Sequence, residues 1–199
     1  MNLELAKHLD KARDTVTEVD RIVSSHGYPD DRRTVLVRGV LAAMRQHHQS
    51  ALELLKSGAV FSAYALARDL IRDLRYGLWI NSCATEEQII RLENGEEFPL
   101  EIAEMTKEVE AAYGADPFFH GLKNRWGPQL TKYSLYNVFQ LGRWIADSRS
   151  GLHYDEDEIR EVMTIATLGI VLLAAMFLAS QKHPLDCKQV EALAANYDS

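Results

Sequence analysis

The chain has 199 residues, of which 47% are hydrophobic and 26% charged, and a formal net charge of −7. A chain of this length can bury a sizeable core, and we expect a single domain over residues 1–199. The composition excludes a disordered or collagen-like chain. The acidic balance disfavours broad electrostatic wrapping of nucleic acid, although it permits a local basic site.

The two cysteines, Cys83 and Cys187, stand far apart and lack the spacing of metal ligands. Isolated cysteines are typical of reduced thiols in a cytosolic protein. Residues 1–5 lack the basic and then apolar regions of a signal peptide. We therefore expect a cytoplasmic protein.

Apolar residues recur at steps of four and three over residues 3–24, which predicts an amphipathic helix. Residues 27–30 interrupt this pattern, and Asp30 or Asp31 can cap a second helix. The second helix is expected to end at Ser57-Gly58, where the glycine can adopt the left-handed conformation that closes helices. His48 lies on its apolar face, which indicates a histidine at the edge of the core rather than a metal ligand paired with His47.

A third helix is predicted over residues 59–82, and it forms an antiparallel hairpin with the second. One face is apolar, whereas the charged side chains of residues 68–73 alternate between arginine and aspartate. This alternation is typical of a salt-linked surface. The alternative is a buried arginine, Arg68 or Arg72, held by a carboxylate.

Residues 85–112 contain nine acidic side chains against Arg91 and Lys107. Thr85 and Gln88 have the spacing of a capping box that opens a short helix. The acidic stretch is interpreted as a solvated helical face, with an acidic docking surface as the alternative.

Residues 120–149 have the opposite character, because five lysines and arginines and five aromatic residues accompany a single acid, Asp147. Basic and aromatic side chains together can bind single-stranded nucleic acid through phosphate contacts and base stacking. The alternative is that the aromatic residues belong to the core and the basic residues balance the acidic helix.

Residues 162–181 carry no charge and predict a helix that is apolar on every side. Such a helix is either the buried axis of a bundle or a membrane span. Interspersed Thr164, Thr167 and Ser180, and the absence of flanking basic clusters, favour the buried axis, so no membrane partner is expected. Pro184 ends this pattern, and Asp186 is expected to cap a short last helix.

No strand pattern of useful length occurs in the sequence. The predicted fold class is therefore all-α: a single-domain bundle of about six to eight helices with a buried apolar C-terminal helix. The hairpin formed by the second and third helices is expected to pack on residues 162–181, with Leu172 and Leu173 buried.

Arg149 and His153 are the candidate catalytic residues. Histidine titrates near neutrality and can move the proton of a 2′-hydroxyl, while arginine can bind a phosphate with two hydrogen bonds. Together they could support a ribonuclease that needs no metal. The sequence has no glycine-rich phosphate loop, no Cys-x-x-Cys and no His-Glu-x-x-His, so no cofactor and no metal are predicted.

The segment Arg149-Ser150-Gly151-Leu152-His153-Tyr154, followed by acids and a long apolar helix, resembles the signature of HEPN-domain proteins. Residues 48–55 and 62–68 also resemble HEPN-like families of prokaryotes. The resemblance implies a small helical bundle of the kind found in toxins and abortive-infection systems, with Arg149 and His153 as the catalytic pair.

Active members separate the arginine and the histidine by four to six residues, whereas here the gap is three. Another match places the histidine-bearing segment at residues 130–137, which contain no histidine. The sequence therefore favours a non-catalytic interaction protein, and the alternative is a metal-independent ribonuclease toxin that acts on RNA. The resemblance also implies a homodimer, for which the aromatic residues of 120–149 could supply the interface.

Overall fold

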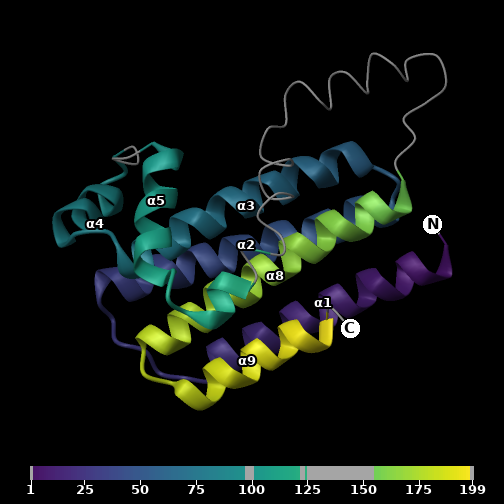
Figure 1. Cartoon of the computed structure of the whole chain (residues 1–199). Coiled ribbons are helices and arrows are strands. Elements are labelled where there is room, and N and C mark those ends of the chain that lie inside the picture. Colours follow the sequence, from purple (N-terminus) through teal and green to yellow (C-terminus); the bar gives the residue numbers. More distant parts are fainter. Residues whose placement is uncertain (1, 97–100, 122–123, 125–154, 198–199) are drawn as a thin grey trace.

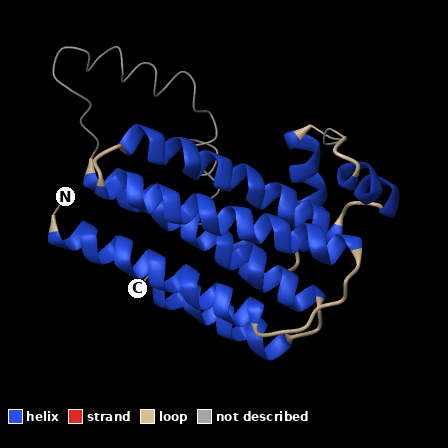
Figure 2. Ribbon diagram, turned by 180° about the vertical axis from the view of Figure 1, so that it is seen from behind, coloured by secondary structure: helices blue, strands red, loops and turns tan. Residues whose placement is uncertain are grey.

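The computed structural model describes residues 2–96, 101–121, 124 and 155–197. Within these ranges the regular elements are helices and no strand occurs, which confirms the all-α prediction (Figure 1 and Figure 2). The helices are α1 (Leu3–Ser24), α2 (Arg32–Lys56), α3 (Val60–Ser82), α4 (Glu86–Glu93), α5 (Ile102–Tyr113), α8 (Glu156–Ser180) and α9 (Pro184–Tyr197).

Helix α8 is the axis of the bundle. It packs against α1, α2, α3 and α9, and all residues from Val162 to Leu178 are buried. Leu172 and Leu173 are 7% and 0% exposed, as expected. By length and composition α8 could cross a membrane, but 94% of its apolar window is buried inside the protein. The apolar surface of α8 is therefore covered by other helices of the same chain, and the predicted core helix is confirmed.

The α2–α3 hairpin packs on α8 as predicted, and α3 approaches α8 most closely where Gly77 faces Leu173. A Cβ atom at Gly77 would lie 2.4 Å from Leu173 Cδ2, which is closer than carbon atoms can approach. Gly169 of α8 faces Leu74 in the same way at 3.3 Å. Small residues thus allow the two backbones to come together at this crossing.

Helix starts follow from side chains that accept hydrogen bonds from free backbone N–H groups. Asn2 accepts from the Leu5 N–H of α1 at 2.8 Å, and Asp31 accepts from the Thr34 N–H of α2 at 3.0 Å. Thr85 and Gln88 form the predicted reciprocal capping box of α4. The choice that the sequence left open, Asp30 or Asp31, is settled in favour of Asp31.

Three helices end in the same turn, in which a residue with positive φ follows the last helical turn and backbone N–H groups bond back to the helix. Gly58 closes α2 with φ 82°, as predicted, and Gly95 closes α4 with φ 78°. Lys182 occupies the equivalent position after α8 with φ 62°. The His183 N–H then donates to the Leu178 carbonyl at 3.0 Å, which fixes where His183 leaves the helix.

The predicted start of the last helix was wrong. Helix α9 begins at Pro184 itself, and Asp186 lies within its first turn rather than at the cap. Proline is favoured at the first helical position because the N–H that it lacks would have no partner within the helix. Asp186 is thereby free to face the neighbouring loop.

The histidine pair on α2 behaves as the sequence indicated. His48 is 1% exposed, and its Nε2 lies 2.9 Å from Thr167 Oγ1 on α8. Burial lowers the pKa of His48 to about 4. His47 points elsewhere, with its Nδ1 3.3 Å from an Asp73 oxygen on α3. The two rings therefore have different partners and do not share a metal site.

Candidate functional site

The predicted catalytic residues Arg149 and His153 lie outside the described residues. So does almost all of the basic and aromatic stretch 120–149, and with it the predicted dimer interface. The described chain resumes at Asp155, two residues after His153. The cap residue of helix α8 therefore lies close to His153 in the chain, within about 7 Å along the backbone.

The N-terminus of α8 is acidic. Asp155 caps it by accepting from the Asp157 N–H at 3.1 Å, and Glu156, Asp157 and Glu158 form the first turn. The positive end of a helix dipole can bind a phosphate, but here a carboxylate of the chain already occupies that position. The four acids from Asp155 to Glu158 therefore make this helix end negatively charged.

A groove of about 700 Å³ lies beside this helix end, between α1, α8 and the end of α9. Its ionisable lining comprises four acids, three basic residues and one histidine: Glu4, Asp157, Glu158, Glu161, Lys7, Lys11, Arg160 and His8. Lys7 pairs with Glu4 at 2.9 Å and Arg160 with Asp157 at 3.6 Å. The basic residues are thus balanced locally, and the groove offers no concentrated positive charge.

His8 is the half-buried centre of this groove. Its Nε2 lies 2.9 Å from the Tyr197 hydroxyl and 3.1 Å from Thr164 Oγ1. Burial and then the positive charge of Arg160 lower the pKa of His8. His8 connects α1 with α8 and α9, and both hydroxyls are engaged in holding those helices together.

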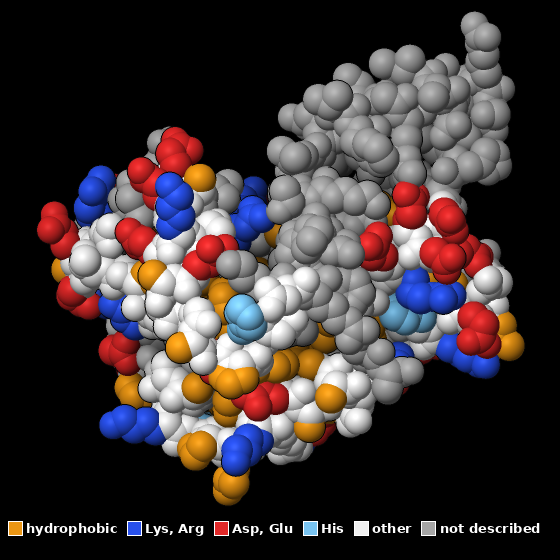
Figure 3. All heavy atoms as spheres, in the orientation of Figure 1, with side chains coloured by type: hydrophobic (Ala, Val, Ile, Leu, Met, Phe, Trp, Pro, Cys, Tyr) orange, Lys and Arg blue, Asp and Glu red, His pale blue; other side chains and the backbone are white. Residues whose placement is uncertain are grey.

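The opposite end of the molecule carries a second acidic feature, which we call the acidic arm: residues 85–96 and 101–113, with α4 and α5. These residues contain eight glutamates against Arg91 and Lys107. In Figure 1 both helices project from the end of the α2–α3 hairpin, and in Figure 3 acidic side chains lie over this region with basic side chains among them. The acidic stretch of the sequence is therefore a projecting surface.

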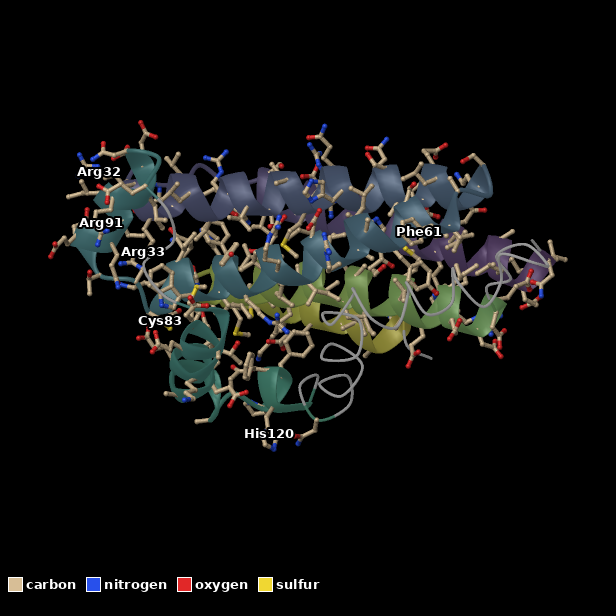
Figure 4. The ribbon with its side chains drawn as sticks, turned by 90° about the horizontal axis from the view of Figure 1, so that it is seen from above. Arg32, Arg33, Phe61, Cys83, Arg91 and His120 are labelled. Atoms are coloured by element: carbon tan, nitrogen blue, oxygen red, sulfur yellow. The ribbon has the colours of Figure 1, made fainter. Side chains whose placement is uncertain are left out.

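Arginines hold the base of the acidic arm. Arg32 pairs with Glu93 at 2.7 Å, and Arg33 donates to the Ala84 carbonyl at 2.6 Å and to the Ile80 carbonyl. Figure 4 shows Arg32, Arg33 and Arg91 at the same end of the bundle, far from Phe61 near the start of α3. The exposed glutamates farther along the arm include Glu87, Glu101 and Glu104.

Polar contacts also fasten α5 to α3. The buried Trp79 indole N–H donates to Glu108 Oε2 at 2.7 Å, and Asn81 Nδ2 donates to the Tyr113 hydroxyl at 2.8 Å. Asn81 reaches α8 as well, where Ser180 donates to its Oδ1 at 3.1 Å. These directional bonds fix how the acidic arm is oriented on the bundle.

Among the described residues, one group brings together three side chains of metal-ligating types: His26, His183 and Asp186. Sequence reasoning missed it because His26 lies in a different part of the chain, and only the His183-x-x-Asp186 spacing was visible. Comparisons of the chain with protein-family models, with curated proteins and with solved structures find no match.

Proposed function

We propose that this protein is a non-catalytic, HEPN-like helical interaction protein that binds a basic surface of another protein through the acidic arm. The observation that carries the proposal is the oriented projection of the acidic arm from the end of the bundle, with six glutamates on α4 and α5 and two, Glu96 and Glu101, beside these helices. Complementary charge on two surfaces raises the association rate and selects the partner.

The attachment of the acidic arm supports this function. A merely solvated helical face needs no fixed orientation, whereas Trp79, Asn81 and Arg33 fix the arm through bonds to α5 and to the end of α3. A surface that is already ordered binds without a further entropic cost of ordering. The acidic arm therefore has the properties of a preorganised docking surface.

The negative charge at the N-terminus of α8 supports the absence of catalysis on RNA. Asp155 caps α8, and the three acids after it lie beside the position of His153 in the chain. The ribonuclease alternative depends on Arg149 and His153 binding a phosphate in this environment, which would be opposed by the charge of the first turn of α8.

Calorimetric titration of the full chain with a lysine-rich helical peptide of about 20 residues tests the docking surface. The triple variant Glu87→Lys, Glu101→Lys, Glu104→Lys is expected to weaken binding by at least about tenfold at low salt. The control Asp10→Lys, Asp14→Lys, Glu53→Lys makes the same charge change at exposed positions of α1 and α2 and should change binding far less. Equal losses in both variants would contradict a specific surface.

Incubation of the purified protein with a labelled RNA tests the absence of catalysis. The RNA is expected to stay intact, and expression of the protein is expected to leave growth unaffected. RNA cleavage that disappears in Arg149→Ala and His153→Ala would overturn the proposal and establish the ribonuclease.

We propose that the protein forms a homodimer, as the family resemblance implies. Sedimentation at micromolar concentrations is expected to give about twice the chain mass of 22.5 kDa. A mass that remains at 22.5 kDa on concentration would exclude the dimer.

A further inference from the structure

Two connections of the chain meet at one end of the bundle. The residues between α1 and α2 lie beside the turn between α8 and α9, as both ribbon views show (Figure 1 and Figure 2). His26 comes from the first connection, His183 from the second, and Asp186 from the first turn of α9. The three side chains are half-buried, so they are partly sheltered and still reachable from solvent.

The ligand atoms of the three residues lie within 4.8 Å of one another. His26 Nε2 is 3.3 Å from an Asp186 carboxylate oxygen, and the two imidazole rings stack with centroids 4.1 Å apart. Ligand atoms around a tetrahedral Zn²⁺ with bonds of about 2.0–2.1 Å are about 3.3 Å apart. One pair already has this separation, and small side-chain rotations that splay the rings would bring in the third atom.

His26 Nε2 is a buried atom without a hydrogen-bond partner among the described residues, because its approach to Asp186 lacks hydrogen-bond geometry. A buried polar atom without a partner costs free energy. A cation placed between the nitrogen and the carboxylate oxygen would satisfy both atoms. The unsatisfied hydrogen-bonding capacity of His26 Nε2, directly beside a carboxylate oxygen, is what a cation between the two atoms would satisfy.

Neighbouring residues hold the cluster in place. Lys182 has positive φ, a conformation that costs a non-glycine residue free energy, and the turn that it makes directs His183 towards His26. Tyr28 packs edge-on against His183 and donates its hydroxyl to the Val23 carbonyl at 2.8 Å. Because the Val23 carbonyl engages its hydroxyl, Tyr28 forms a wall of the site and is not one of the proposed ligands.

We propose that His26, His183 and Asp186 bind a divalent transition-metal ion of the Zn²⁺ type, with the fourth coordination position open to solvent. Two imidazoles and one carboxylate suit Zn²⁺, whereas Mg²⁺ and Ca²⁺ prefer oxygen ligands alone. Bound metal would join the α1–α2 connection to the α8–α9 turn and so clamp α9 onto the bundle. The site is independent of the acidic arm, which lies elsewhere on the surface.

Titration of chelator-treated full-length protein with Zn²⁺ tests the site. One ion per chain is expected to bind, and the melting temperature is expected to rise with metal concentration. Substitution of Co²⁺ is expected to give the visible absorption of a four-coordinate ion. Failure of the wild-type protein to take up one equivalent would overturn the proposal.

Variants identify the ligands. The double variant His26→Ala, His183→Ala is expected to lose at least about tenfold in Zn²⁺ affinity, and Asp186→Asn, which preserves the side-chain shape, should also weaken binding. The matched control His120→Ala removes an exposed histidine that is not part of the cluster (Figure 4) and should leave affinity unchanged. Circular dichroism verifies that each variant is folded. Unchanged affinity in the folded double variant, or an equal loss in the control, would contradict the assignment.

Discussion

Helix α8 and the acidic arm are held in the protein by different kinds of interaction. Helix α8 is buried from Val162 to Leu178 and packs against α1, α2, α3 and α9 through apolar contacts. In the acidic arm, Ile89, Met105 and Val109 are buried, while the contacts that orient it are polar ones from Trp79 and Asn81. Helix α8 therefore determines whether the chain folds, whereas the polar contacts of the acidic arm determine how its acidic surface is oriented.

This difference bears on function. Non-directional apolar burial supplies most of the free energy of folding, whereas hydrogen bonds of fixed geometry specify orientation at a modest net gain. A projecting acidic surface that is held by directional bonds can open locally without unfolding the bundle. Substitutions in α8 should therefore lower the free energy of global unfolding. Substitutions in the acidic arm should mainly lower the free energy of its local opening.

The largest effect is expected from Phe177→Ala. Phe177 is 0% exposed, and its ring packs 4.9 Å from that of Tyr28. Removing a buried phenyl group leaves a cavity and should lower the free energy of unfolding by about 3–5 kcal/mol. Urea denaturation followed by circular dichroism measures this loss. A loss below about 1 kcal/mol would show that α8 is not the organising core.

His48 should make stability depend on pH. Its folded-state pKa of about 4 lies below the ordinary value of 6.5, so the unfolded chain binds a proton that the folded chain does not. The stabilisation is complete above pH 6.5 and is lost as the pH falls from 6.5 towards 4, by about 3 kcal/mol. His48→Gln keeps a hydrogen-bonding group for Thr167 and should flatten this slope. The same slope in the variant would exclude His48 as its source.

Glu108→Ala should have a smaller effect on global stability. It removes the carboxylate that accepts from the Trp79 indole at 2.7 Å, and water can replace it because Glu108 is exposed. We expect a loss of about 1 kcal/mol, together with faster amide exchange in α5 than in α8. The control Glu104→Ala also removes one negative charge from α5, but not the hydrogen bond to Trp79. Equal effects of both changes would indicate that the charge, and not the hydrogen bond, matters.

Lys182→Gly should produce the smallest change in the free energy of unfolding. Unlike the other substitutions, it should raise this free energy. Gly58 and Gly95 occupy the equivalent positions after α2 and α4, whereas Lys182 adopts positive φ with a side chain. Glycine relieves this strain and should stabilise the protein by about 0.5–1 kcal/mol. Thermal denaturation measures the gain. Destabilisation would mean that the Lys182 side chain makes a contribution that outweighs the strain.

Much of the fold could be predicted from the sequence, because helical periodicity and caps are local signals. The interruption at 27–30, a cap at Asp30 or Asp31 and the left-handed Gly58 follow from neighbouring residues alone. The end of α8 was predicted to within one residue, but the turn that closes it was not, since Lys182 occupies a position where glycine is usual. The start of α9 was misplaced because Pro184 was interpreted only as an interruption.

The candidate sites were less predictable, because they depend on contacts between distant parts of the chain. Nothing near His26 in the sequence indicates that it meets Asp186 at 3.3 Å. The acids of α4 and α5 were visible in the sequence, but their fixed projection depends on Trp79 and Asn81. Arg149 and His153 remain sequence predictions, since they lie outside the described residues.

Native-state hydrogen exchange compares the two regions most directly. Amides of α8 between Gly169 and Leu178 are expected to exchange only through global unfolding, with the free energy that urea denaturation gives. Amides of α4 between Ile89 and Leu92 are expected to exchange through a local opening that costs several kcal/mol less. Equal protection of the two helices would contradict the account, because it would make the acidic arm part of the same cooperative unit as the core.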